Sequence, residues 1–455
     1  TKEAGSTGGY EEKIRAAESA GARVVLIGRP LEETGLSLEE VKADLMKRLQ
    51  LPVRRTVSIV GIGMGAAENM TVEAQKACRD AQLLVGAGRM LEQVREFGKP
   101  LFVSYKPEEI FRYVTDHPEY EHVALLQSGD VGFYSGAKRL LNYFKDEEVH
   151  MYPGISSVVC LCSSLKTSWE DVVLVSMHGR QANIIAKVKN NRKVFALVGK
   201  GPEVNELCRK LLYYGFGEVR MSVGENLSYE TERIRTGTPG ELLTEVFEDL
   251  CVVLLENDRP AKIITHGLED EEFLRAKVPM TKSEVRSISL SKLHLTKDAV
   301  VYDVGAGTGS ISIEAALQAE DGTVYAIEKK TEAVELIREN QRKFAVDNLV
   351  IAEGFAPEAL EELPAPTHAF IGGSSGNLKE ICEVILHKNP AARIVINCIA
   401  LETVAEALDC MKTLPVTDVD ITAVSAAKSK VLGSYHMMMG QNPVYVISCT
   451  GEGAL

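Results

Sequence analysis

A glycine-rich turn in the C-terminal third of the chain carries the clearest chemical signal. It lies in the run Val300-Val-Tyr-Asp-Val-Gly-Ala-Gly-Thr-Gly-Ser310, where an apolar strand leads into three glycines and then into an apolar helix over residues 311–319. Glycine allows a ligand to approach the backbone where any Cβ would collide with it. Glu328 ends the next apolar run, and a carboxylate there can accept hydrogen bonds from both hydroxyls of a ribose. The pattern therefore predicts a nucleoside-binding site.

Two kinds of nucleoside ligand use such parts, and the glycine spacing separates them. The glycines are Gly305, Gly307 and Gly309, preceded by Asp303, so the motif is Gly-x-Gly-x-Gly and not Gly-x-Gly-x-x-Gly. A nicotinamide dinucleotide places its pyrophosphate at the helix N-terminus. S-adenosylmethionine has no phosphate and carries a sulfonium cation, which suits Asp303. We predict an S-adenosylmethionine-dependent methyltransferase domain from about Met280 onward, with a dinucleotide site and a turn that binds nothing as the alternatives.

The N-terminal half has glycine and serine motifs of its own. The predicted strand Val57–Val60 is followed by Gly61, Gly63 and Gly65, which by themselves fit a ligand site and a structural turn equally well. Three further motifs follow predicted strands, and each would place small or polar groups at the carboxyl edge of a sheet, where α/β proteins bind ligands. These motifs are Ser128-Gly-Asp-Val-Gly-Phe-Tyr-Ser135, Pro153-Gly-Ile-Ser-Ser157 and Ser176-Met-His-Gly-Arg180.

Two pairs of basic residues are candidates for binding an anionic substrate. Lys282 and Arg286 are four apart in a helix-compatible stretch and could present one basic face, the alternative being a solvated helix face. His178 and Arg180 are similar candidates, the alternative being a polar turn. We interpret His294 and His436 as structural, and Met437-Met-Met439 as packing in the core or between subunits.

Apolar runs alternate with amphipathic stretches along most of the chain, as in stacked α/β units. Residues 1–52 read as a helix (10–20), a strand (23–27) and a helix (37–49), too little to bury a sheet alone. We predict an α/β domain over 56–256, a linker over 257–278 and a second α/β domain over 279–455. The predicted strands of the two domains are 57–60, 83–85, 123–126, 172–175, 194–198, 252–255, 299–304, 323–327, 349–351, 369–371, 393–397, 418–424 and 444–448.

The bulk composition excludes several classes of protein. The 455 residues carry a formal net charge of −13, which argues against a general nucleic-acid binder. The 9 cysteines are scattered, and although Cys160 and Cys162 are close, no second pair stands at zinc-ligand spacing, so we expect no metal site and reduced thiols in a cytoplasmic protein. We find no membrane-spanning run and no signal peptide. The first residue is Thr, which predicts that the chain starts within a longer gene product or is trimmed.

The order and spacing of these motifs resemble the tetrapyrrole methylase family. Residues 56–455 as a whole are similar to the two-domain precorrin-6Y C5,15-methyltransferases (decarboxylating) of cobalamin biosynthesis. The matches in the second domain are Met280-Thr-Lys-Ser-Glu-Val-Arg286, Asp303-Val-Gly-Ala-Gly-Thr-Gly309, Ile371-Gly-Gly-Ser-Ser-Gly376 and Asn442-Pro443. The resemblance implies a two-lobed α/β domain that methylates C5 of precorrin-6B or its cobalt form. It further implies a Rossmann-like class I methyltransferase domain that methylates C15 and decarboxylates the C12 acetate.

The resemblance also assigns site residues. In the second domain, it implies donor contacts at Thr281, Asp303, Gly305, Ala306, Gly307, Thr308, Gly309, Glu328 and Ala356. In the first domain, it implies donor contacts at Gly129, Asp130, Ser156 and Ser157, with Gly61, Gly63 and Gly65 on the substrate side because that fold binds the donor between two lobes. One departure stands out: the family usually has Gly-Asp-Ala-Pro where this chain has Gly354-Phe-Ala-Pro357. An acidic contact near the adenine is then lost at Phe355 or supplied by Glu353.

A second, shorter resemblance covers the N-terminus. Residues 1–30, with Thr1-Lys-Glu-Ala-Gly-Ser-Thr-Gly-Gly-Tyr10 and Gly28-Arg-Pro30, resemble the end of the precorrin-6A reductases, which implies that this chain lacks most of such a domain and has no reductase activity. The implied partners are an anionic tetrapyrrole and further copies of the chain. The alternatives are a methyltransferase for another substrate, a nicotinamide-dependent oxidoreductase, and a tetrapyrrole carrier without catalytic activity.

Overall fold

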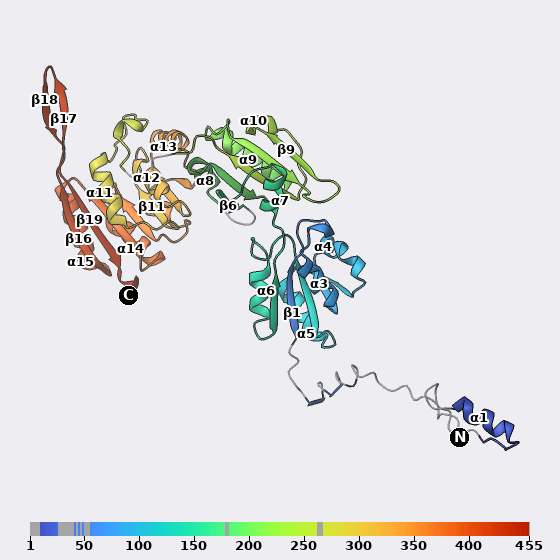
Figure 1. Cartoon of the computed structure of the whole chain (residues 1–455). Helices are drawn as coiled ribbons and strands as arrows, with labels where there is room; N and C mark the ends of the chain where they lie inside the picture. The colour runs from blue at the N-terminus through green and yellow to red at the C-terminus, as the bar shows by residue number, and fades with distance from the viewer. Residues whose placement is uncertain are drawn as a thin grey trace. The chain divides into compact units, whose positions relative to one another are not determined.

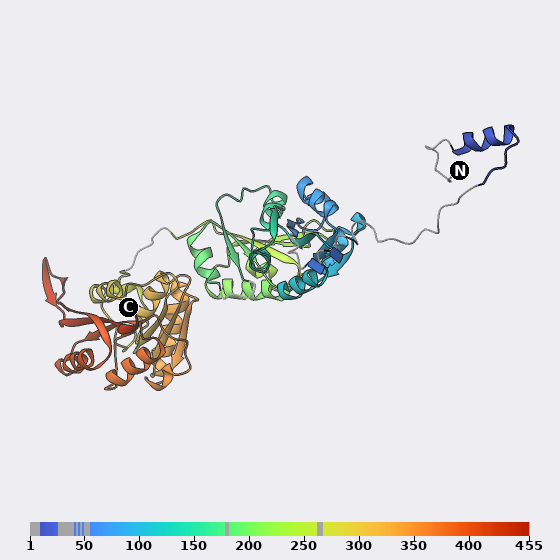
Figure 2. The ribbon, with the colours of Figure 1, turned by 90° about the horizontal axis from the view of Figure 1, so that it is seen from below.

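The fold is that of a computed structural model. It describes residues 10–25, 55–177, 182–261 and 267–454, together with residues 41, 44, 45, 48 and 49. The chain divides into two compact units (Figures 1 and 2). The first contains residues 1–63 and 67–154, and the second contains residues 64–66 and 155–455. Each unit is described by itself.

The first unit is built on a five-stranded parallel sheet with strand order β3-β2-β4-β1-β5. Its strands are β1 (Thr56–Gly61), β2 (Leu83–Gly86), β3 (Leu101–Val103), β4 (His122–Gln127) and β5 (Glu148–Tyr152). Its helices are α1 (Tyr10–Ser19), α3 (Val72–Asp80), α4 (Gly88–Gln93), α5 (Pro107–Asp116) and α6 (Ala137–Tyr143), with a short 3₁₀ turn at Arg95–Phe97. Alternate side chains of β1 enter two apolar clusters, one with α3 and α4 and one with α5 and α6, so helices cover both faces.

The second unit begins with a mixed sheet of strand order β6-β7-β10-β8-β9, in which only β6 and β7 are parallel. The strands are β6 (Val172–Ser176), β7 (Lys193–Leu197), β8 (Arg220–Glu225), β9 (Arg233–Gly237) and β10 (Cys251–Glu256). The helices are α7 (Ser157–Ser164), α8 (Ile184–Asn190), α9 (Gly201–Tyr213) and α10 (Pro239–Leu242). One apolar cluster fills the space between α8, α9 and this sheet.

The rest of the second unit, from residue 267 onward, is called the C-terminal domain. Its seven-stranded sheet has the order β13-β12-β11-β14-β15-β19-β16, with the first five strands parallel and β19 antiparallel to both neighbours. The strands are β11 (Val300–Val304), β12 (Thr323–Glu328), β13 (Leu349–Glu353), β14 (His368–Ile371), β15 (Arg393–Cys398), β16 (Val416–Val424) and β19 (Val444–Gly451). Chain order reverses between β11 and β14, which makes the carboxyl edge there the expected ligand site.

Helices lie on both faces of this sheet (Figure 2). They are α11 (Ser283–Leu293), α12 (Ser310–Gln318), α13 (Thr331–Phe344), α14 (Leu378–Lys388) and α15 (Leu401–Thr413). Val301 of β11 packs in the cluster that contains residues of α11, α12 and α13, and the next residue, Tyr302, packs in the cluster with α14 and α15. This alternation is the physical reason that residues 300–304, apolar except for Asp303, form a strand buried on both sides.

A two-stranded hairpin projects from the C-terminal domain (Figure 1). It consists of β17 (Ala427–Leu432) and β18 (Tyr435–Gly440). Met437, Met438 and Met439 are about half exposed on β18, so the expectation that they pack in the core is wrong for the single chain. His436 is exposed as well, whereas His294 ends α11 in a left-handed conformation, in keeping with a structural role.

All thirteen strands expected for the two large domains are present. The N-terminal segment agrees less well, since α1 forms where a helix was expected but residues 23–25 of the expected strand are not in a strand. Within the expected linker, Leu268 and Phe273 pack against the apolar cluster of the C-terminal domain, and Phe273 is only 3% exposed. None of the described helices is long and apolar enough to cross a membrane, and the described residues contain no group of three His, Cys, Asp or Glu that could hold a metal ion.

Candidate functional site

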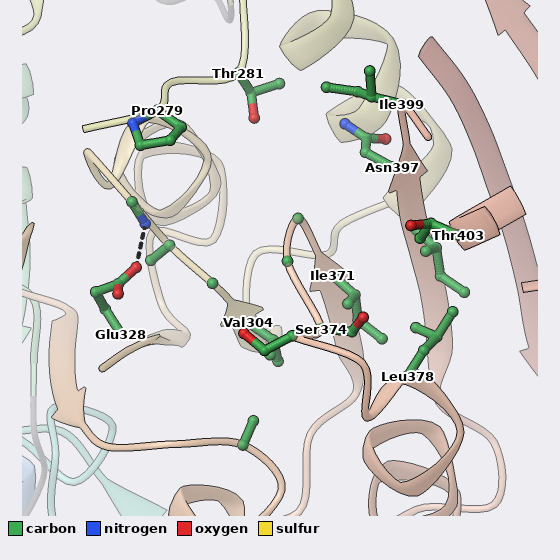
Figure 3. Close-up of a pocket in the computed structure, with 18 of the residues that line it drawn as sticks. Pro279, Thr281, Val304, Glu328, Ile371, Ser374, Leu378, Asn397, Ile399 and Thr403 are labelled. Carbon is green, nitrogen blue, oxygen red and sulfur yellow. Dashed lines mark hydrogen bonds between the residues drawn. The ribbon is translucent and has the colours of Figure 1, made fainter. Parts of the chain in front are cut away.

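A cavity of about 1080 Å³ opens at the carboxyl edge of the seven-stranded sheet (Figure 3). Its lining comes from the segments that follow β11, β12, β13 and β14, from the end of β15, and from the segment Val278–Lys282 that precedes α11. Among the residues that the structure describes, every one that lines the cavity falls between Val278 and Val444, so in the described part of the chain the C-terminal domain supplies the lining.

The glycine turn after β11 is closely packed against two other segments. Gly305, Gly307 and Gly309 all have positive φ, between 56° and 77°, which L side chains rarely adopt. A Cβ on Gly305 would lie 2.8 Å from the carbonyl oxygen of Gly373, and one on Gly307 would lie 2.7 Å from that of Pro279. The glycines are therefore required for contacts within the protein as well as for the approach of a ligand.

Glu328 is fixed at the edge of the cavity by backbone amides. Its Oε2 accepts a hydrogen bond from the amide of Gly307 at 3.0 Å, the bond drawn in Figure 3. Its Oε1 accepts from the amides of Lys329 at 2.9 Å and Lys330 at 3.0 Å. A carboxylate offers about four lone-pair positions, so Oε2 keeps the capacity to accept from a ligand hydroxyl. The chain thus presents an anchored acceptor beside the glycine turn, as the sequence predicted.

Asp303 lies beneath the turn and does not line the cavity. It is 1% exposed, its Oδ2 accepts a hydrogen bond from the hydroxyl of Ser312, and its Oδ1 has no hydrogen-bond partner among the described residues. Burial, reinforced by the charge of Glu328 and opposed by the Ser312 hydrogen bonds, raises the pKa of Asp303 from 3.8 to about 7. Thr308 and Gly309 are likewise buried behind the lining, whereas Thr281, Gly305, Ala306, Gly307, Glu328 and Ala356 do line the cavity.

Arg286 does not reach the cavity, which corrects its assignment as a substrate-binding residue. The side chain is 0% exposed, and its guanidinium donates to Glu314, to Asp270, to the carbonyl of Leu268 and, at 2.7 Å, to the carbonyl of Thr281. The two carboxylates that neutralise it come from segments distant in sequence, which explains why spacing alone misled. Lys282 does line the cavity, with its Nζ 3.5 Å from Asp270 Oδ2.

Phe355, and not Glu353, faces the cavity where the family usually has an aspartate. Lys329 stands over its ring, with Nζ 4.9 Å from the ring centroid, and donates a 2.8 Å hydrogen bond to Ser375 Oγ. Glu353 lies outside the lining and accepts a 2.8 Å hydrogen bond from Thr331. The acidic contact near this end of the cavity is therefore absent from the lining, and an apolar ring takes its place.

Four glycines of the first unit join the segments after adjacent strands. A Cβ on Gly61 would lie 2.7 Å from both Gly129 O and Gly154 N, and Gly63 pairs with Gly129 through backbone hydrogen bonds of 3.2 and 2.7 Å. Asp130 secures the same junction, since its carboxylate accepts from the amides of Gly132 at 2.8 Å and Gly154 at 3.0 Å. Gly61 and Gly63 thus have a packing role, and they shape the carboxyl edge of this sheet.

The remaining predicted residues of the methylase domain belong to the second unit. Ser156 and Ser157 are buried where α7 begins. A Cβ on Gly65, whose φ is 152°, would lie 2.5 Å from the Tyr229 ring, so a side chain has no room there. His178 and Arg180 lie outside the described residues.

Sequence reasoning missed several residues that line the C-terminal cavity. They include Asn397, Ile399, Thr403 and Gln441, together with the lysines Lys329 and Lys330 beside Glu328. The only sequence signal for Asn397 and the two lysines is their position at the end of an apolar strand. That signal is weak because polar residues follow most strands.

The two domains match two known families. Residues 272–450 match the precorrin methyltransferase domain, and residues 56–243 match the tetrapyrrole (corrin/porphyrin) methylases. A probable cobalt-precorrin-6B C(15)-methyltransferase (decarboxylating) from Pyrobaculum calidifontis is 41% identical over 187 residues, covering 40% of this chain and 95% of that relative. A precorrin-6Y C(5,15)-methyltransferase (decarboxylating) from Sinorhizobium sp. is 28% identical over 374 residues, covering 81% of this chain and 90% of that relative.

Among solved structures, the precorrin-6Y C5,15-methyltransferase from Geobacter metallireducens GS-15 is 39% identical, with a TM-score of 0.39, and covers 40% of this chain and 96% of that one. The short relative from Pyrobaculum calidifontis is matched over nearly its whole length. The chain therefore belongs to the precorrin methyltransferase family.

Proposed function

We propose that the chain is a bifunctional S-adenosylmethionine-dependent methyltransferase of corrin biosynthesis. It methylates precorrin-6B, or the cobalt form, at C5 and C15 and decarboxylates the C12 acetate. The observation that carries the proposal is the anchored carboxylate of Glu328 beside a glycine turn, within a cavity that the C-terminal domain completes alone. The Sinorhizobium relative is similar over 81% of this chain, and its name includes methylation at positions 5 and 15 and a decarboxylation.

The turn fits a donor without phosphate better than a nicotinamide dinucleotide. A dinucleotide needs the N-terminus of the helix after the turn to be open to its pyrophosphate. Here Thr308, Gly309 and Ser310, where α12 begins, are all buried and lie outside the cavity lining. The site therefore lacks the open helix N-terminus that a nicotinamide-dependent oxidoreductase would need for its pyrophosphate.

Each end of the donor has a matching part of the cavity. Oε2 of Glu328 would accept from the ribose hydroxyls, Phe355 and Ala356 would contact the adenine, and the glycine turn and Thr281 would hold the amino-acid end. When bound, S-adenosylmethionine supplies the methyl group. The chain holds donor and acceptor in line and keeps water away, which is most of what a methyl transfer to an electron-rich carbon needs. Lys282, Lys329 and Lys330 at the cavity provide positive charge for a polycarboxylate substrate.

The first domain is proposed to perform the C5 methylation, with donor contacts at Gly129, Asp130, Ser156 and Ser157. The match of residues 56–243 to the tetrapyrrole methylases supports this assignment. We further propose that the protein acts in the cytoplasm as a homo-oligomer.

Mass spectrometry of the reaction tests the proposal. The protein is incubated with S-adenosylmethionine and precorrin-6B, with and without cobalt, and donor binding is measured in parallel by calorimetry. A product heavier by two methyl groups and lighter by one carbon dioxide supports both activities. Donor binding without any change in either substrate would leave a methyltransferase for a different acceptor, and failure to bind the donor would overturn the donor assignment as well.

A further inference from the structure

The cavity of the C-terminal domain has a second half that the donor residues do not use. Figure 3 shows Glu328 on one side and Asn397 and Ile399, from the end of β15 and the residue after it, on the other. Ile399 is 63% exposed, although it is a large apolar residue at the rim of a cavity. An apolar rim suits the face of a flat macrocycle, so we take this half to be the acceptor side, which rests on the proposed function.

Asn397 is held in one orientation from behind. Its Nδ2 lies 2.9 Å and its Oδ1 3.1 Å from the hydroxyl oxygen of Ser289, which is itself 0% exposed on α11. The Ser289 hydroxyl also donates to the carbonyl of Val285 at 2.8 Å. Because a hydroxyl has a single proton, donating it to Val285 leaves Ser289 as an acceptor for the Asn397 amide.

This arrangement leaves the amide with hydrogen-bonding capacity on the cavity side. A primary amide has two N–H donors and an oxygen with two lone pairs. Ser289 accepts from one of the two N–H donors, so the other N–H is left for a ligand. The cavity therefore contains an anchored neutral donor, in contrast to the cations Lys282, Lys329 and Lys330 on the same lining.

A neutral donor suits a carboxylate that must lose its charge. In a decarboxylation, the bond between the methylene carbon and the carboxylate carbon breaks, carbon dioxide leaves, and the electron pair passes into the conjugated ring. A proton from water then completes the methyl group. A cation paired with that carboxylate would stabilise the ground state more than the transition state and so raise the barrier. An amide N–H orients the group with less ground-state stabilisation than an ion pair gives.

We propose that Asn397 binds and positions the acetate carboxylate that is lost as carbon dioxide, and that Ser289 holds Asn397 in place. Asn397 is thus a substrate-contacting residue specific to the decarboxylation, while the donor contacts serve the methyl transfer. The cationic lysines would then bind the carboxylates that the product retains.

The test compares the products of the wild-type chain with those of Asn397→Leu, Asn397→Asp and Ser289→Ala. We expect Asn397→Leu to slow decarboxylation by about 10- to 100-fold, the effect of losing one hydrogen bond to a charged group, so that methylated product still carrying the acetate accumulates. Asn397→Asp should slow decarboxylation more than Asn397→Leu does, because its negative charge repels the acetate carboxylate. Ser289→Ala should slow decarboxylation less than Asn397→Leu does.

Donor binding by calorimetry and thermal unfolding separate this role from a structural one. Asn397→Leu should keep the donor dissociation constant within about twofold, because Asn397 lies away from Glu328. Parallel loss of methylation and decarboxylation, or an unchanged product ratio, would overturn the inference. If the wild-type chain itself gives no product, it is the proposed function that fails, which is distinguishable from a wild-type chain whose product ratio Asn397 does not affect.

Discussion

Asp303 is the residue whose charge state the fold alters most clearly. Its pKa is raised from 3.8 to about 7 by burial, so the folded protein keeps this proton to near neutrality while the unfolded chain releases it near pH 4. A folded state that binds the extra proton gains stability at low pH and loses it as the pH rises through 7. The stability contributed by this carboxyl is therefore present at pH 4 and absent at pH 8.

Replacing Asp303 by Asn should remove this pH dependence. The amide oxygen can still accept the hydrogen bond from Ser312, and no charge remains to be buried. Relative to wild type, the variant should gain on the order of 4 kcal/mol in unfolding free energy between pH 4 and pH 8, because the pKa of Asp303 is raised from 3.8 to about 7 and each pKa unit corresponds to about 1.4 kcal/mol. Urea denaturation at both pH values gives the free energies of unfolding. A difference in unfolding free energy between variant and wild type that does not vary with pH would contradict the assignment.

Phe355 provides a second test at the scale of single residues. It is the aromatic ring of the cavity lining, and we expect the adenine to stack on it in place of the hydrogen bond that an aspartate would make. Phe355→Ala should weaken the binding of S-adenosylhomocysteine by about tenfold, in the range measured for stacking of a base on an aromatic ring. Calorimetry gives the dissociation constants. Phe355→Leu is the control for apolar area without a ring, and equal affinity of Phe355→Ala and wild type would exclude stacking.

At the scale of elements, one buried ionic cluster joins the segment before α11 to the body of the domain. Arg286 donates to Asp270 and to Glu314, and Glu314 in turn accepts from the amides of Gly267 at 2.6 Å and Leu268 at 3.2 Å. Because Arg286 also holds the carbonyl of Thr281, the cluster fixes the part of the cavity wall that contains Thr281. Its contribution is positional, since it stands behind the lining.

Arg286→Met should destabilise the C-terminal domain by about 3–5 kcal/mol, because two buried carboxylates lose their partner. It should also weaken donor binding through the loosened Thr281 segment. Thermal unfolding and calorimetry measure the two effects. Arg338→Met is the matched control: Arg338 and its partner Glu335 are both about half exposed, and such a pair contributes less than about 1 kcal/mol. Equal effects of the two variants would show that the buried cluster has no special role.

The elements that the sequence predicts well are those whose signal is local. The strands buried on both faces, such as β11, are mostly apolar runs; the glycine turn directly follows β11, and Glu328 is the last residue of β12. The strands that escaped prediction lack such a run. β3 has only three residues, β5 is half exposed at a sheet edge, and β17 and β18 are almost entirely exposed. β8 is largely buried but alternates Met221 and Val223 with Ser222 and Gly224, and β9 is mostly polar. The roles of single residues could not be predicted where their partners are distant in the chain. Glu314 and Asp270 hold Arg286 away from the cavity, and Ser289 holds the side chain of Asn397.

At the scale of the whole molecule, the completeness of the C-terminal cavity makes the two proposed methylations separable. No residue before Val278 is among those that line the cavity in the described part of the chain. A lesion at Glu328 should therefore leave the first domain intact. We expect Glu328→Ala to give a product that gains one methyl group and keeps all of its carboxylates, because both the C15 methylation and the decarboxylation are assigned to the C-terminal domain.

The complementary lesion is Ser156→Val with Ser157→Val, two buried serines at the start of α7 where the first domain is expected to meet its donor. It should give a product that gains one methyl group at C15 and loses carbon dioxide. Isotopic labelling of the donor methyl and mass spectrometry identify each product, and circular dichroism confirms that each variant is folded. Loss of both methylations in a folded Glu328→Ala variant would mean that the C5 methylation depends on the C-terminal domain. That result would contradict the independence that a cavity built from residues 278–444 implies.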